Sequence, residues 1–189
     1  MFALIIGIDA YLHAPKLKGA VADADRLQSF LITQVGAKTD RIITLRNENA
    51  TREAIVRAFH NLWECLSIQH EDPVLIFYAG HGCEMPRPKG WETGGNEMIQ
   101  AICPCDMTRG VPSKQAIYPI PDLTIAIWLN VLSSKKGNNI VSTQNKPVPG
   151  PKLLSFRRSF LTAVIPQAEH GFQRKGYVIW SSLTGSLVP

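Results

Sequence analysis

Residues 73–82 read PVLIFYAGHG, and this stretch decides the fold class. Pro73 to Tyr78 is an apolar run without polar alternation, which is typical of a strand covered on both faces in a parallel sheet. The run stops at Gly80-His81-Gly82. Ligands and catalytic groups gather at the carboxyl ends of parallel strands, and the two glycines let the backbone turn there. His81 is therefore a candidate functional residue, against the plainer interpretation of a surface histidine in a glycine turn.

Strand and helix patterns alternate on both sides of that stretch. Short apolar runs mark the strands, and apolar residues at helical spacing with acids or caps at the start mark the helices. The expected elements are, in order, a strand at 2–9, a helix at 20–35, a strand at 41–45, a helix from Thr51 to Leu66, the strand at 73–78, a polar loop from Cys83 to about Met98, a short strand at 99–103, a helix from Pro121 to Gly137, and a strand over 139–143. This alternation predicts an α/β fold with a mostly parallel sheet and helices on both faces.

The net charge of +5 is confined to the end of the chain. Residues 1–140 hold 14 Lys and Arg against 14 Asp and Glu, whereas residues 141–189 hold 6 against 1. Prolines in residues 146–151 would break a strand or helix there, and beyond them 152–164 suggest a weak basic helix and 176–183 a short strand. We therefore expect a domain at 1–140 and a basic, proline-interrupted tail. The tail is either a loosely packed extension, which is favoured, or a basic element that contacts nucleic acid.

Composition and hydropathy exclude several classes of protein. The 189 residues are 45% hydrophobic and 19% charged, so the chain can bury a core and is neither fibrous nor wholly disordered. No apolar run reaches the ~20 residues that cross a bilayer, and residues 1–9 are too short and lack the basic start of a signal peptide. We therefore expect a cytoplasmic protein without membrane contact, in which the four cysteines are thiols.

Several segments resemble the metacaspase branch of the caspase-like cysteine peptidases, peptidase family C14, and occur in the same order. They are residues 2–9, 17–24, 77–82, 102–106, 120–123 and 137–140. The most specific is YAGHG, residues 78–82, at the end of a buried strand. The resemblance covers residues 1–140, without extending into 141–189. It implies a caspase-like three-layer sandwich.

The resemblance also implies an endopeptidase with a Cys–His dyad that prefers Arg or Lys in its polypeptide substrate and acts in programmed cell death. His81 matches the histidine, which takes the thiol proton and later protonates the leaving amine. A backbone amide at Gly82 would help to hold the oxyanion. Asp23 matches an acidic residue that binds the substrate cation, although stabilisation of its own helix dipole is an equal alternative. The family further suggests Ca²⁺ as a cofactor, with Asp106 as one ligand.

The nucleophile of the family is missing from its expected place. It should follow the strand at 139–143, yet no cysteine occurs between Asp106 and Pro189. Cys83, two positions after His81, and Ser142, near the missing turn, are weak substitutes. The sandwich is therefore expected to be incomplete at its C-terminal side. We expect a truncated or altered caspase-like peptidase domain, and the change in charge and proline content after Ile140 favours foreign sequence in the tail as the origin of the missing cysteine. The alternatives are a caspase-like binding or regulatory protein that does not cleave, and an α/β module that binds nucleic acid through its tail.

A zinc site is the competing chemistry for the same region. His81, Cys83, Cys103 and Cys105 have the residue types that bind zinc. The spacings His-x-Cys and Cys-x-Cys are tighter than usual for zinc ligands. Free thiols are the favoured interpretation, and we expect no metal there.

Overall fold

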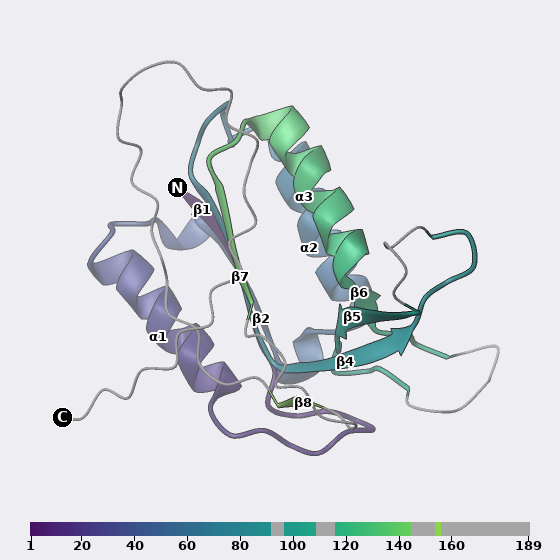
Figure 1. The fold of residues 1–189 in the computed structure, drawn as a ribbon. Coiled ribbons are helices and arrows are strands. Elements are labelled where there is room, and N and C mark those ends of the chain that lie inside the picture. Colours follow the sequence, from purple (N-terminus) through teal and green to yellow (C-terminus); the bar gives the residue numbers. More distant parts are fainter. Residues whose placement is uncertain (92–96, 109–115, 145–153, 156–189) are drawn as a thin grey trace, which may run out of the picture.

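The computed structural model describes residues 1–91, 97–108, 116–144 and 154–155. Its main sheet has four parallel strands in the order β2-β1-β3-β7 (Figure 1). These strands are β1 (Phe2–Gly7), β2 (Ile42–Arg46), β3 (Val74–Ala79) and β7 (Ile140–Gln144). Every residue of the two central strands, β1 and β3, is buried, which explains their unbroken apolar sequences.

Helices cover both faces of this sheet (Figure 1). α1 (Ala20–Thr33) lies on one face, and α2 (Arg52–Glu64) and α3 (Asp122–Lys136) lie together on the other. Alternate side chains of β1 divide between the two cores, so that Ile5 packs with Leu31 of α1, and Ile6 packs with Phe59 and Leu129. The structure therefore confirms the expected three layers and the mostly parallel sheet.

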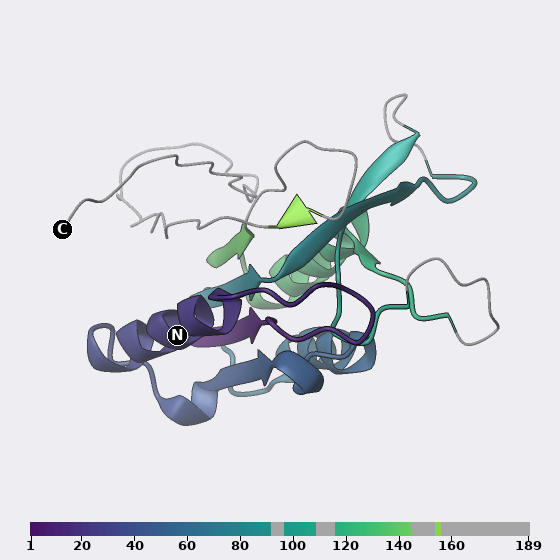
Figure 2. The ribbon, with the colours of Figure 1, turned by 90° about the horizontal axis from the view of Figure 1, so that it is seen from below.

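A second, antiparallel sheet begins where β3 ends (Figure 2). Its order is β6-β5-β4-β8, with β4 at His81–Pro86, β5 at Met98–Ile102, β6 at Ile120–Pro121 and β8 at Leu154–Ser155. Only Gly80 separates β3 from β4. His81 therefore stands at the junction of the two sheets.

The predicted polar loop from Cys83 to about Met98 is wrong at its start, whereas its end agrees with the structure to within one residue. Residues 83–86 belong to β4, and Met98 is the first residue of β5. From Cys83 to Pro86 the residues of β4 alternate between half-buried and exposed, as in a strand with one face toward solvent. The exposed Glu84 and Pro86 give this strand the composition of a loop, and pairing with β5 overrides that local signal.

The remaining expected elements agree with the observed ones to within two residues at each end. β7 runs four residues past the expected boundary at 140 and pairs with β3 from Val74↔Ile140 to Tyr78↔Gln144. The expected helix at 152–164 is wrong at its two described residues, Leu154 and Ser155, which form β8 by pairing with β4. The rest of that helix and the expected strand at 176–183 lie outside the described residues. Among the helices of the described part, none is long and apolar enough to cross a membrane.

Candidate active site

His81 is the first residue of β4, directly beyond the carboxyl end of a central strand. Its relative exposure is 3%, and it is the one polar or charged residue that is buried within the described part of the chain. The turn that brings it there requires glycine at position 80. A Cβ on Gly80 would lie 2.6 Å from the hydroxyl oxygens of both Tyr11 and Tyr78. The structure thus places a buried imidazole at the sheet edge that the sequence indicated.

The imidazole of His81 is held by the segment between β1 and α1, residues 8–19, which we call the histidine loop. The Nε2 atom of His81 lies 2.7 Å from the carbonyl oxygen of Pro15. A carbonyl oxygen only accepts, so Nε2 carries the proton, and Nδ1 is the acceptor of the neutral ring. The ring of Tyr11 packs against the imidazole, with 4.7 Å between the ring centroids. In this tautomer His81 can take a proton at Nδ1.

Two tyrosine hydroxyls fix the backbone of His81. The Tyr11 hydroxyl accepts from the His81 N–H at 2.7 Å. The Tyr78 hydroxyl donates toward the carbonyl oxygens of His81, at 2.7 Å, and Cys103, at 3.0 Å. Burial raises the pKa of both tyrosines above the ordinary value, so both hydroxyls keep their protons.

Gly82 is buried beside His81 on β4. It pairs with Ile102 of β5 on one side and with Leu154 of β8 on the other. The His81 carbonyl accepts from the Cys103 N–H at 2.9 Å, so this carbonyl points to the side of β5. Successive residues of a strand direct their peptide groups to opposite neighbours, so the Gly82 amide faces the β8 edge. The amide expected to hold an oxyanion therefore lies next to His81 and faces β8, which pairs with β4 at this residue.

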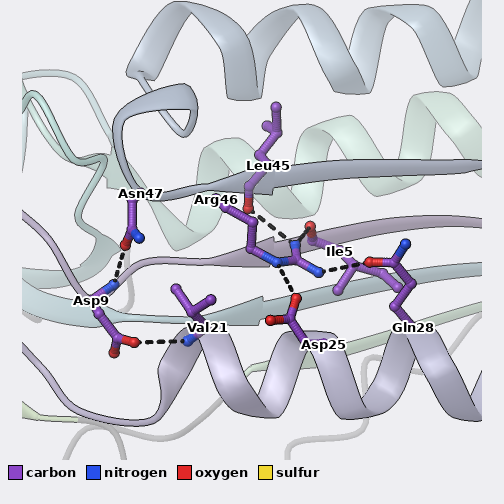
Figure 3. Close-up of polar contacts among 8 residues, drawn as sticks. All are labelled: Ile5, Asp9, Val21, Asp25, Gln28, Leu45, Arg46 and Asn47. Atoms are coloured by element: carbon purple, nitrogen blue, oxygen red, sulfur yellow. Dashed lines mark hydrogen bonds and ion pairs between the residues drawn. The ribbon is translucent and has the colours of Figure 1, made fainter.

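Asp23 lies in the first turn of α1 but does not cap that helix. The carboxylate that caps it belongs to Asp9, whose two oxygens accept from the N–H groups of Ala20 and Val21 at 2.9 and 3.2 Å. Figure 3 shows the bond to Val21. The Oδ1 atom of Asp23 lies 2.9 Å from Nη1 of Arg26, and 27% of the Asp23 side chain is exposed. The histidine loop, which holds His81, leads directly into α1, the helix that carries Asp23.

The cysteines near His81 do not form a metal site. Cys83 is half-buried on β4, and Cys103 and Cys105 are buried. Burial, followed by the charge of Asp106, raises the pKa of the Cys105 thiol to about 11, so this thiol is protonated at neutral pH. In the part of the chain that the structure describes, which includes these residues and His81, no group of three or more His, Cys, Asp or Glu side chains could hold an ion.

Asp106, the residue suggested for calcium, serves the start of α2. Its Oδ1 accepts from the Arg52 N–H at 2.9 Å, next to Thr51, whose hydroxyl accepts from the Ala54 N–H at 3.1 Å. Calcium takes about six to eight oxygen ligands. The described residues gather no such group around this helix-capping carboxylate, so they do not fit a calcium ion at Asp106.

β7 occupies the place beside β3 where the family's nucleophile strand is expected. Ser142 pairs with Ile76 in the middle of β3, and the last pair joins Tyr78 and Gln144. His81 lies beyond the end of β3, so the register separates Ser142 from it by several residues along the strand direction. The structure does not bring Ser142 to His81.

Sequence reasoning missed two residues that hold His81. Pro15 acts through its backbone carbonyl, which every residue type has, so no sequence pattern could mark it. Tyr11 left a weak signal in the sequence. It is an aromatic residue shortly after β1, and β1 pairs in parallel with β3, the strand that leads to His81.

Comparisons with known proteins point to one family. A family model described as the caspase domain, peptidase C14, matches residues 1–133. Metacaspase-1 of Cryptococcus neoformans var. neoformans serotype D is 33% identical over 110 residues, which are 55% of this chain and 23% of that protein. Metacaspase-1A of Aspergillus oryzae is 26% identical over 136 residues, which are 69% of this chain and 30% of that protein. The chain spans less than a third of the length of these relatives.

A solved structure shares the fold. It is a crystal structure of a protein from Geobacter sulfurreducens, with a TM-score of 0.53 and 20% sequence identity. The match covers 75% of this chain and 47% of that one. At this identity the likeness concerns the fold alone.

Proposed function

The chain belongs to the caspase-domain family, peptidase C14, and from that membership we propose that His81 is the general base of a cysteine endopeptidase site. The observation that carries the proposal is the 2.7 Å hydrogen bond from His81 Nε2 to the Pro15 carbonyl, on a side chain that is 3% exposed. This bond leaves Nδ1 as the proton acceptor. A base whose second nitrogen is held by a third group is the arrangement that activates a thiol.

In a complete site of this kind, Nδ1 of His81 takes the proton of a cysteine thiol, and the sulfur attacks the peptide carbonyl carbon. The Gly82 N–H stabilises the oxyanion that forms. The C–N bond then breaks as the imidazolium returns its proton to the leaving amine, and a thioester remains. A water molecule, deprotonated by His81, attacks the thioester, and the thiol is released.

The chain does not supply a cysteine at the end of β7. Its four cysteines, Cys65, Cys83, Cys103 and Cys105, all precede that strand. Cys83 lies on the same strand as His81 and not on the neighbouring one, so its position gives no line of attack like that of the family. We therefore propose that this chain binds polypeptides without cleaving them.

Asp23 is proposed as the partner of an Arg or Lys side chain in the bound polypeptide. Its present partner, Arg26, is 68% exposed. Exposed ion pairs are worth little in water, so a substrate cation can replace Arg26 at low cost. The family resemblance extends the proposal to a cytoplasmic protein that acts in programmed cell death.

Reporter peptides that contain Arg or Lys test the proposal. We expect the unsubstituted chain to bind them but give no turnover, because loss of the nucleophile leaves only binding and oxyanion effects. Turnover that a thiol alkylator abolishes would contradict this, and the labelled cysteine would identify the nucleophile. A graft of an Asp-Cys-Cys turn after Gln144 should restore cleavage. If His81→Ala in that graft is equally active, His81 is not the base.

Nucleic-acid binding through the basic tail is the competing function, and the charge of residues 141–189 is the observation that favours it. Such binding would weaken steeply between two salt concentrations in a filter assay, because phosphate contacts release counterions. Tight, salt-sensitive binding without any affinity for the Arg and Lys peptides would replace the peptidase proposal.

A further inference from the structure

Asn47 makes a pair of contacts with the histidine loop from the turn after β2. Its φ is 44°, in the left-handed region that asparagine adopts more readily than most residues. Its Oδ1 accepts from the N–H groups of Asp9 and Ala10, at 2.9 and 3.0 Å. Figure 3 shows the bond to Asp9. One side chain thus satisfies two successive amides at the start of the loop, 38 and 37 residues away in the sequence.

The histidine loop leads from these two amides directly to His81. Tyr11, which follows Ala10, packs on the imidazole and accepts from the His81 N–H. The Leu17 N–H donates to the Asp9 carbonyl at 2.8 Å, which closes the loop around Pro15. The position of the Pro15 carbonyl therefore depends on where residues 9 and 10 are held, together with the bond from the Leu12 N–H to the Cys105 carbonyl at 3.0 Å.

The other end of the loop is fixed from the last residue of β2, directly before the same turn. Arg46, adjacent to Asn47, donates to the Ile5 carbonyl at 2.7 Å, and to Asp25 and Gln28 of α1 at 2.9 and 3.1 Å (Figure 3). These bonds join α1 to the main sheet near the N-terminus of the helix, which Asp9 caps. Residues 46 and 47 consequently fix both the entry and the exit of the histidine loop.

We propose that Asn47 is a positioning residue for His81. Its amide oxygen sets the entry of the histidine loop, and through Tyr11 and Pro15 the loop holds the imidazole with Nε2 protonated and Nδ1 as the acceptor. The catalytic use of this tautomer rests on the proposed function, whereas the tautomer itself does not.

The test is the tautomer of His81, measured by ¹⁵N NMR of the imidazole nitrogens in the full chain. His81→Gln assigns the signal among the five histidines. Asn47→Gly keeps the positive φ and removes the acceptor, and Asn47→Asp keeps both. Thr51→Ala, which removes the N-cap of α2, is the control for general destabilisation. We expect one Nε2–H tautomer in the unsubstituted, Asn47→Asp and Thr51→Ala chains, and a mixture of both tautomers in Asn47→Gly.

Hydrogen exchange supplies a second measurement, and its first part needs no substitution. In the unsubstituted chain, the amides of Asp9, Ala10 and His81 should open together, with the same dependence on denaturant. In Asn47→Gly, the Asp9 and Ala10 amides should exchange about tenfold faster, as expected for the loss of their acceptor. An unchanged single tautomer in Asn47→Gly, or an independent opening of the His81 amide, overturns the proposal. Neither readout involves cleavage, so the failure of the peptidase function would leave this result intact.

Discussion

At position 80 the absence of a side chain lets β3 turn into β4 against the buried Tyr78 and the partly buried Tyr11. A Cβ there would lie 2.6 Å from both hydroxyl oxygens and 2.8 Å from Cζ of Tyr78. Neither tyrosine can retreat without breaking its bond to the His81 backbone. We expect Gly80→Ala to lower the free energy of unfolding by about 1–3 kcal/mol, the usual cost of overpacking, measured by urea denaturation.

The control for Gly80→Ala is the same substitution in a chain that carries Tyr11→Phe and Tyr78→Phe. Both oxygens nearest to the new Cβ are absent there, so the added cost should fall. An equal cost in the two backgrounds would show that the backbone at Gly80, and not the hydroxyls, resists the methyl group.

The role of Asp23 can be separated from its place in α1. In the chain with the grafted cysteine turn, Asp23→Asn keeps the size of the side chain and removes its charge. We expect kcat/KM for Arg and Lys peptides to fall by an amount equivalent to about 1.5–3 kcal/mol, the range of a charge-assisted hydrogen bond, with no change for uncharged peptides.

Arg26→Gln is the matched variant for Asp23, because it removes the cation that now pairs with this carboxylate. It should raise the affinity for Arg and Lys peptides. If Asp23→Asn lowers activity equally for charged and uncharged peptides, Asp23 only supports its own helix.

At the scale of the elements, two adjacent lysines at the end of α3 make very different contacts. Lys136 Nζ donates to the carbonyl oxygens of Cys65 and Ile68, just after α2, at 2.8 and 3.3 Å. Lys135 pairs with Glu64 on the surface. Lys136→Met keeps the apolar stem and removes both bonds, so we expect the free energy of unfolding to fall by about 1–3 kcal/mol.

Lys135→Met is the matched control, and it should change stability little because an exposed ion pair gains little in water. Thermal unfolding of the two variants side by side measures the difference. Equal losses would mean that the ammonium of Lys136 does not anchor α3, and through it β7, to the end of α2.

The elements also show which features the sequence can predict. β1 and β3 are buried on both faces, and their apolar runs predicted the parallel sheet. β4 was missed because pairing with β5, and not its own composition, makes it a strand. Pro15 left no signal because it acts through its backbone carbonyl. Asn47 left none because its side chain bonds to amides 38 and 37 residues away in the sequence. His81 was found because the end of a buried strand is visible in the sequence.

At the scale of the molecule, the parallel topology explains why distant residues meet around His81. β1, β2 and β3 run in the same direction, so the segments that follow them emerge at one edge of the sheet. These segments are the histidine loop, the turn with Arg46 and Asn47, and Gly80-His81. Three separate parts of the chain therefore meet at one edge of the sheet, and together they support the imidazole.

Truncation tests how far the domain extends. β7 pairs with β3 over five residue pairs, whereas β8 pairs with β4 over two. Ile140 and Val141 also pack on opposite faces of the sheet. We expect chains that end at Ser155 and at Gln144 to have similar free energies of unfolding, measured by urea denaturation.

A chain that ends at Asn139 should be less stable than these by at least about 2 kcal/mol, because it loses the partly buried side chains of Ile140 and Val141. It should also aggregate, since the edge of β3 is left unpaired. The opposite pattern, with the main loss between Ser155 and Gln144 and little further loss at Asn139, would place the end of the domain beyond Gln144. It would also mean that β8, and not β7, stabilises the junction at His81.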